Sequence, residues 1–169
     1  MAQTSEHKPA GRPFNSPLEY GLRMLFLLHA TAPKEADLQR LISYDYLLVH
    51  SNDVEKGPHS LHPAVPFRGA EWLVKRDMIR DGLDLMFSRE LLDKRFTPHG
   101  ITYAANKLTK AFLSLLKSKY ARELGARSQW VSGRFGELSD QALGAFMSEN
   151  IGRWGTEFER LTALRELEL

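Results

Sequence analysis

The chain has no cysteine and no long apolar run. Its 169 residues include no Cys, which excludes disulfide bonds and thiolate chemistry. The longest apolar run, from Met24 to Leu28, is far shorter than the roughly 18 residues that a membrane-spanning helix needs. The start of the sequence also lacks the apolar segment of a signal peptide. We therefore expect a cytoplasmic protein whose core forms without covalent cross-links.

The sequence also has little net charge and lacks the common catalytic motifs. A net charge of +2, with 43% hydrophobic and 26% charged residues, is typical of an ordinary globular protein. No phosphate-binding P-loop, Rossmann glycine pattern or nucleophile elbow is present. We therefore predict no catalytic residues and no cofactor, and the chain is not expected to be an enzyme.

Charge is distributed unevenly along the chain. Residues 89–127 contain nine Lys or Arg against three acidic residues, whereas residues 134–169 contain four Arg against seven acidic residues. One interpretation is a solvated basic face followed by an acidic tail. The other is a basic surface that binds a nucleic acid or an acidic partner. The counts alone do not choose between these interpretations.

The N-terminal third contains clear helix signals. Residues 1–13 are polar and predict a disordered arm. A first helix should begin at Ser16, with Pro17 in the first helical position and Glu19 completing a capping box. It is apolar on almost every side, which predicts a central place in the core. A second helix after residue 33 carries Asp45 in its apolar stripe, either at the rim of the core or as an anchor for the loop that follows.

A hairpin signal defines the predicted fold class. After a third helix over residues 68–87, residues 91–96 and 101–103 read as strands around a turn, and another helix follows. Three helices, a hairpin and a closing helix are the element order of a winged-helix domain. We predict a mainly α protein, with a winged-helix-like domain over 14–118 and a helical extension over 119–169. The alternative is an irregular helical bundle with an inserted hairpin.

The polar loop, which we define as residues 50–67, is the most informative segment for function. Its prolines and apolar residues predict an ordered, packed loop, and ordered long loops commonly contact a ligand or partner. We expect its polar side chains to face outward. The predicted partner contacts in and beside it are Asp45, His50, Ser51, Asp53, His62, Pro63, Arg68 and Trp72.

Two other chemistries remain open. His50, His59 and His62 with Asp53 supply ligand types for zinc, but their spacing matches no zinc signature, and we predict no metal site. A nucleic acid is the other candidate ligand, although the third helix is poorly equipped to bind one because its acidic residues offset its basic ones. The predicted phosphate-binding residues are therefore Lys94, Arg95, Lys107 and Lys110.

Three segments carry a family resemblance. Residues 15–23, 45–51 and 60–63 resemble the middle component of bacterial ABC-three-component systems, which are similar to the Lamassu group of anti-phage defences. The resemblance extends from about residue 14 to 158. It implies a non-catalytic adaptor that works with an SMC-like ABC ATPase and an effector, often a nuclease. The alternative function is a winged-helix DNA-binding regulator, and a third, weaker option is a metal-dependent enzyme.

Overall fold

In a computed structural model, the backbone is described for residues 16–63 and 68–167, and the side chains for 16–63 and 75–154. The predicted N-terminal arm therefore lies outside the described residues. Six α-helices, one 3-10 helix and three strands follow in the order α1 (Pro17–Thr31), β1 (Ala36–Asp37), α2 (Leu38–Val49), η1 (Ser51–Asp53), α3 (Arg68–Ser88), β2 (Asp93–Thr97), β3 (Gly100–Ala104), α4 (Lys107–Leu113), α5 (Lys119–Phe135) and α6 (Asp140–Leu167).

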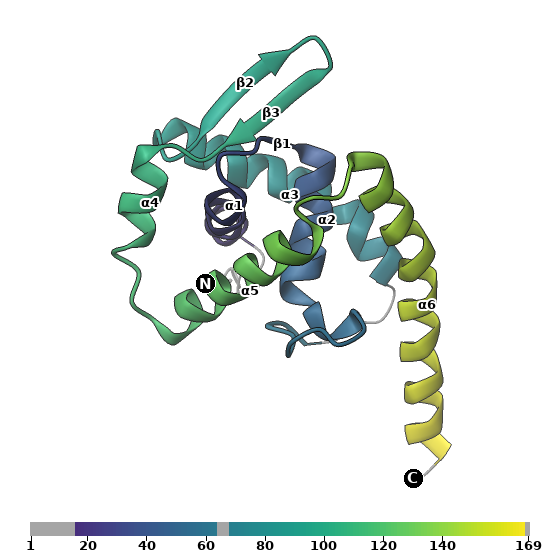
Figure 1. Cartoon of the computed structure of the whole chain (residues 1–169). Coiled ribbons are helices and arrows are strands. Elements are labelled where there is room, and N and C mark those ends of the chain that lie inside the picture. Colours follow the sequence, from purple (N-terminus) through teal and green to yellow (C-terminus); the bar gives the residue numbers. More distant parts are fainter. Residues whose placement is uncertain (1–15, 64–67, 168–169) are drawn as a thin grey trace, which may run out of the picture.

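Helix α1 is the centre of the molecule. It begins at the predicted residue, with the Ser16 hydroxyl accepting from the Glu19 backbone N–H at 3.2 Å and Pro17 in the first turn. The Glu19 carboxylate accepts from the Tyr120 hydroxyl rather than completing the predicted capping box. Four of its apolar side chains are fully buried, namely Met24, Leu25, Leu27 and Leu28. Figure 1 shows α1 end-on, with the other helices arranged around it. The predicted central position of this helix is confirmed.

Helices α1 and α3 cross at two glycines. A Cβ atom added to Gly21 would lie 2.8 Å from the Gly82 carbonyl oxygen. One added to Gly82 would lie 2.6 Å from the Gly21 nitrogen. Real Cβ atoms do not approach backbone so closely, so the two helices touch through their backbones. This contact fixes α3 against the central helix.

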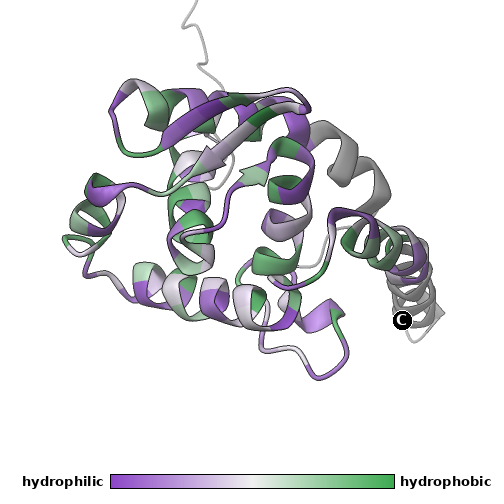
Figure 2. Ribbon diagram, turned by 45° about the horizontal axis from the view of Figure 1, so that its top comes forward, coloured by the Kyte–Doolittle hydropathy of each residue, from purple (hydrophilic) through white to green (hydrophobic). Residues whose placement is uncertain are grey.

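The three strands form one small antiparallel sheet in the order β1-β3-β2. The predicted hairpin is present, with Asp93 opposite Ala104 and Thr97 opposite Gly100, and the turn uses Gly100 at a φ of 129°. Figure 2 shows that β2 is the more hydrophilic of the two hairpin strands. Strand β1, which the sequence does not predict, pairs with β3. The predicted mainly helical class with a short hairpin is confirmed.

The core continues from α1 into α5 and α6. Helix α5 has Ser118 as its N-cap, and it buries Leu124 and Val131 in the same apolar cluster as α1. Residues 140–167 form one helix, α6. Its Trp154 stacks on Tyr46 of α2, with 5.2 Å between the ring centroids. Beyond this contact α6 extends past the rest of the molecule (Figure 1).

Candidate partner-docking site

Three charged side chains meet inside the core, each from a different helix. The Arg23 guanidinium of α1 donates to both carboxylate oxygens of Asp45 on α2, at 2.6 and 3.1 Å. The Lys75 ammonium of α3 lies 3.5 Å from Asp45 Oδ2. Their exposed fractions are 1%, 0% and 5%, so water is almost fully excluded. We call Arg23, Asp45 and Lys75 the buried ionic triad.

The triad remains charged because each charge has a partner of opposite sign. Burial alone would raise the pKa of the Asp45 carboxyl, but the charges of Arg23 and Lys75 outweigh burial and hold that pKa below its ordinary value. Burial alone would lower the pKa of Arg23, but the negative charge of Asp45 outweighs burial and raises that pKa above its ordinary value. The triad therefore ties α1, α2 and α3 together, because separating them would strand a buried charge.

The sequence prediction marks Asp45 as unusual but misses its partners. Asp45 does not lie at the rim of the core, because Arg23 and Lys75 satisfy it inside. A signal for this pairing does exist in the sequence. Arg23 is a lone cation in an almost wholly apolar helix, and Asp45 is a lone anion in another apolar stripe. Two such residues of opposite sign are candidates for a buried pair.

A second series of polar contacts leads from the triad to the polar loop. Arg23 Nη1 lies 3.8 Å from Glu19 Oε1, and the Tyr120 hydroxyl donates to the same oxygen at 2.9 Å. The Tyr120 oxygen also lies 2.8 Å from His62 Nε2. Because a hydroxyl has only one proton to donate, His62 Nε2 carries the proton in this contact. We call Arg23, Glu19, Tyr120 and His62 the relay. It connects the polar loop to α1 through Tyr120 of α5.

Burial keeps both ring side chains of this relay neutral. Burial, followed by the positive charge of Arg23, lowers the pKa of His62 to about 4. Burial, followed by the negative charge of Glu19, raises the pKa of Tyr120 above its ordinary value. At neutral pH, His62 is therefore uncharged and Tyr120 keeps its proton. A protonated tyrosine and a neutral histidine with a donating Nε2 position the loop, and neither is an activated nucleophile.

The polar loop is ordered over residues 50–63, which confirms the prediction for that part. Inside the loop, Ser51 Oγ lies 3.0 Å from the His59 carbonyl oxygen. From α5, Arg127 Nε donates to the same carbonyl at 2.8 Å. Arg134 Nη1 of α5 donates to the Glu55 carbonyl, also at 2.8 Å. The loop backbone is therefore fixed both by its own side chains and by the neighbouring helix.

The expected outward orientation is wrong for three of the predicted contact residues. Asp45 and Ser51 are 0% exposed, and His50 is 2% exposed. Asp45 belongs to the triad, Ser51 bonds to loop carbonyls, and the His50 ring lies 5.0 Å from the Tyr46 ring. A partner does not reach these side chains in this fold. They shape the loop from within.

The other predicted contact residues differ in exposure. Pro63 is exposed, whereas Asp53 and His62 are half-buried. The Asp53 carboxylate accepts from the Tyr46 hydroxyl at 2.7 Å. Arg68 and Trp72 lie in α3, but their side chains lie outside the described residues.

Four loop residues that the prediction does not name as contacts are exposed, namely Asn52, Glu55, Lys56 and His59. Burial of the apolar and hydrogen-bonding side chains around them leaves these four on the surface. No sequence pattern marks them, because exposure within an irregular loop depends on its tertiary anchoring.

Two of the four predicted phosphate-binding cations are paired with carboxylates. Lys94 Nζ lies 3.2 Å from Asp84 Oδ1, and the Arg95 guanidinium donates to the Glu35 carboxylate. These pairs attach β2 to α3 and to the segment before β1. The other two cations lie on α4 and are exposed. The four predicted phosphate-binding residues therefore form two groups: a pair on β2 that is neutralised by carboxylates and a pair on α4 that is exposed.

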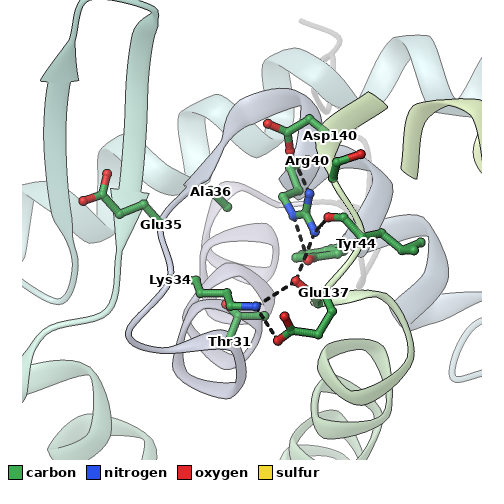
Figure 3. Close-up of a pocket in the computed structure, with 11 residues that line it drawn as sticks. Thr31, Lys34, Glu35, Ala36, Arg40, Tyr44, Glu137 and Asp140 are labelled. Carbon is green, nitrogen blue, oxygen red and sulfur yellow. Dashed lines mark hydrogen bonds and ion pairs between the residues drawn. The ribbon is translucent and has the colours of Figure 1, made fainter. Parts of the chain in front are cut away.

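A charged hollow of about 560 Å³ lies where α1, β1 and α2 meet the turn between α5 and α6 (Figure 3). The Arg40 guanidinium donates to Asp140 Oδ1 at 2.7 Å and to the Leu138 carbonyl at 2.6 Å. Lys34 Nζ lies 2.5 Å from Glu137 Oε1. Arg40 also donates to the Phe135 carbonyl at 3.2 Å, at the C-terminal end of α5, where the helix dipole favours a cation. Its partner Asp140 lies in the first turn of α6, where the dipole favours an anion. Through these contacts, Arg40 of α2 holds the turn between α5 and α6 and the first residue of α6. We call this turn the joint between α5 and α6.

Within residues 16–63 and 75–154, no three His, Asp or Glu side chains gather closely enough to hold a metal ion. In the part of the chain whose backbone is described, no helix combines the length and apolar character that crossing a bilayer requires.

Comparison with known proteins identifies the family. The model of the family described as ABC-three component (ABC-3C) system Middle Component 2 matches residues 13–157, which include the triad, the polar loop and the hairpin. No curated protein and no solved structure matches the chain. The predicted resemblance to a middle component is confirmed, because the match covers most of the sequence. The chain belongs to the Middle Component 2 family of ABC-three component systems.

Proposed function

We propose that this chain is a non-catalytic adaptor that bridges an SMC-like ABC ATPase and an effector nuclease. The complex would act in the cytoplasm as a Lamassu-like anti-phage defence. Family membership supports the general role, since a middle component belongs to a system of three components. The identity of the two partners and the defence role rest on the resemblance noted from the sequence.

The observation that carries the proposal is the fixed shape of the polar loop. The relay from Arg23 through Glu19 and Tyr120 holds His62, and two arginines of α5 hold the loop carbonyls. Ordering a loop costs conformational entropy. Because this cost is already met in the free chain, a partner that binds the loop does not have to meet it again. Such a preformed polar surface suits a permanent subunit contact.

The outward residues of the loop define the proposed contact. Five described residues of the loop are exposed, and of these Asn52, His59 and Pro63 are the ones that we propose touch the partner. Arg68 and Trp72, at the start of α3, stay in the proposal as residue types that interface centres favour. Asp45, His50 and Ser51 act as positioning residues beneath this surface.

The test is assembly of the purified chain with the ATPase and the effector of the same system. We expect Asn52→Ala and His59→Ala to weaken assembly by about 1–3 kcal/mol for each residue near the interface centre. The melting temperature should not change, since both side chains are exposed. Gln141→Ala, an exposed polar residue on α6, is the matched control. Unchanged assembly of the double variant would reject the loop as the contact.

The non-catalytic part of the proposal has its own test. We expect the pure chain to turn over neither DNA nor nucleotides when Mg²⁺, Mn²⁺ or Zn²⁺ is added. Turnover that His62→Ala abolished, with the fold intact by circular dichroism, would contradict the proposal.

A winged-helix DNA-binding regulator is the second candidate function. The element order α1-β1-α2-α3-β2-β3 and the sheet order β1-β3-β2 support it. The exposed cations of α4 could contact phosphates. The pairing of Lys94 and Arg95 with carboxylates weakens it, because those two charges are locally neutralised.

Duplex DNA binding should separate the two candidates. If the second is correct, affinity falls steeply as salt rises from about 50 to 200 mM and shows little sequence preference. Lys107→Glu with Lys110→Glu should then abolish binding. Absence of binding at low salt would reject this candidate and leave the adaptor proposal untouched.

A further inference from the structure

An apolar groove of about 250 Å³ lies between α1 and the connection from α4 to α5. Its apolar lining comprises Leu22, Phe26, Leu115, Leu116, Ala121 and Leu124. Leu115 is 73% exposed, which makes it one of the two most exposed large apolar side chains among those described. A single exposed leucine needs no explanation, but one at the edge of an apolar groove marks a surface that a partner can cover.

The edge of this groove is basic. Residues 107–122 contain five cations and no acidic residue, and all five are exposed: Lys107, Lys110, Lys117, Lys119 and Arg122. Lys117 itself lines the groove. The carboxylate that lines the groove belongs to Glu19. It accepts from the Tyr120 hydroxyl and lies beside Arg23. Only a 4.0 Å contact from Lys119 to Glu123 offsets the positive charge along this segment of the described chain.

The groove is preformed, because its basic edge is held by short-range hydrogen bonds. Ser118 Oγ accepts from the Ala121 backbone N–H at 3.1 Å and so caps α5. Arg122 Nη1 donates to the Lys117 carbonyl at 2.8 Å. The Leu116 backbone N–H donates to the Leu113 carbonyl at 3.1 Å. A partner therefore meets a surface that is already ordered, which lowers the entropy cost of binding.

We propose that this groove docks an acidic amphipathic helix of another component of the complex. The proposal rests on the adaptor function above. Charge complementarity identifies the occupant: the apolar floor accepts an apolar stripe at i, i+3, i+4 spacing, and the basic edge attracts carboxylates that flank the stripe. A nucleic acid would match the basic edge only, since its phosphate backbone offers nothing apolar to the exposed Leu115. The cations of the charged hollow differ, because they are bound by the chain itself.

The experiment is site-specific photo-cross-linking in the reconstituted three-component complex. The photoreactive residue p-benzoylphenylalanine replaces Leu115, and mass spectrometry maps the cross-linked segment. We expect a segment of the ATPase or the effector with an apolar helical stripe flanked by Asp or Glu. A cross-link to nucleic acid, to a second copy of this chain or to a segment without acidic residues would overturn the inference, as would no cross-link at all.

Two variants separate the apolar and charged contributions. Leu115→Ser and Lys117→Glu should each weaken assembly at least tenfold, and only the loss from Lys117→Glu should shrink at high salt. Phe96→Ser, an equally exposed apolar residue on the hairpin, and Arg76→Glu, an exposed cation on α3, are the controls. If Lys117→Glu weakens assembly but Leu115→Ser does not, the contact is purely electrostatic and the helix proposal is wrong.

The outcomes for the two proposals are distinct. If the wild-type chain joins neither component, the adaptor proposal fails, and this inference fails with it. If the wild type assembles and both groove variants assemble equally well, the groove inference alone fails and the polar loop remains the proposed contact.

Discussion

The molecule has two concentrations of charge that differ in kind. The buried ionic triad holds three charges within the core, and each is matched by a partner from another helix. The basic segment over 107–122 holds five charges on the surface, and among the described residues its one ion pair is the 4.0 Å contact from Lys119 to Glu123. Charge inside the protein must be paired to be tolerated, whereas charge at the surface is solvated and needs no partner.

This difference separates structural charge from charge available for binding. The triad joins three helices and, through the relay, orders the polar loop, so its loss should affect the fold. Among the described residues, the lysines of the basic segment make no buried ion pair, so their loss should affect binding and leave the fold unchanged. The following predictions test this distinction, in order of decreasing effect on stability.

The largest effect is expected for Asp45→Ala. It removes the buried carboxylate that both Arg23 and Lys75 contact inside the core, which should lower the free energy of unfolding by about 3–5 kcal/mol. Urea denaturation measures the loss. Asp84→Ala is the matched control, because it breaks an ion pair with Lys94 at a half-exposed site and should cost less than about 1 kcal/mol.

If Asp45→Ala prevents folding, the triple variant Arg23→Met, Asp45→Leu, Lys75→Met keeps the comparison measurable. It replaces all three charges of the triad with apolar side chains. This triple variant should recover a folded chain, because it leaves none of the three charges buried without its partner. If Asp45→Ala and Asp84→Ala lower the free energy of unfolding equally, the buried triad stabilises the fold no more than an exposed ion pair does.

The relay predicts a pH dependence. Because the pKa of His62 is about 4 in the folded chain and 6.5 ordinarily, the unfolded chain binds the additional proton between these values. The contribution of His62 is therefore fully present above about pH 6.5 and is lost as pH falls toward 4, by at most about 3 kcal/mol. Urea denaturation of wild type and His62→Gln across this range measures it.

The two curves should converge as the pH falls if His62 is responsible. His99→Gln, which removes an exposed histidine in the hairpin turn, should leave the wild-type curve unchanged. Parallel curves for wild type and His62→Gln would mean that the proton uptake occurs elsewhere.

The joint between α5 and α6 should show an intermediate effect. Arg40→Met removes charge-assisted bonds to Asp140 and to the Leu138 carbonyl, with an expected cost of about 1–3 kcal/mol. Hydrogen exchange should become faster over residues 136–139. Arg153→Met, which loses one bond from an exposed side chain to Asn150, should change stability by less than about 0.5 kcal/mol. If hydrogen exchange over residues 136–139 is equally fast in both variants, Arg40 does not hold the turn between α5 and α6.

The smallest effect is expected on the basic segment. Lys107→Ala with Lys110→Ala should change the free energy of unfolding by less than about 0.5 kcal/mol, because both side chains are exposed. Differential scanning calorimetry checks this. A loss of about 2 kcal/mol or more would show that these lysines pack against the fold, and the contrast with the triad would not hold.

Several elements are predictable because their causes are local. The caps at Ser16 and Ser118 and the hairpin turn over residues 97–100 arise from side chains within a few residues of the backbone they satisfy. Strand β1 is not predictable in this way. It has two residues, too few for a period, and exists because Ala36 and Asp37 pair with a strand more than sixty positions away.

The candidate site is less predictable than the fold. The sequence correctly marks the polar loop as ordered over residues 50–63, because proline and apolar residues restrict an otherwise polar segment. It does not reveal which loop residues face outward. That depends on Arg127 and Arg134 of α5, which bind the loop carbonyls from a distant part of the chain.

The sequence alone determined the helical class, the hairpin, most of the helix starts and the resemblance to a middle component, since periodicity, capping and turn chemistry all act over short distances. Only the tertiary structure decided that Asp45 is buried, that Lys94 and Arg95 are paired and that Arg40 bonds the turn between α5 and α6. Each of these outcomes depends on a partner from a different element. A charged side chain can be buried only where an opposite charge from elsewhere in the fold meets it, and the order of residues along the chain does not show that meeting.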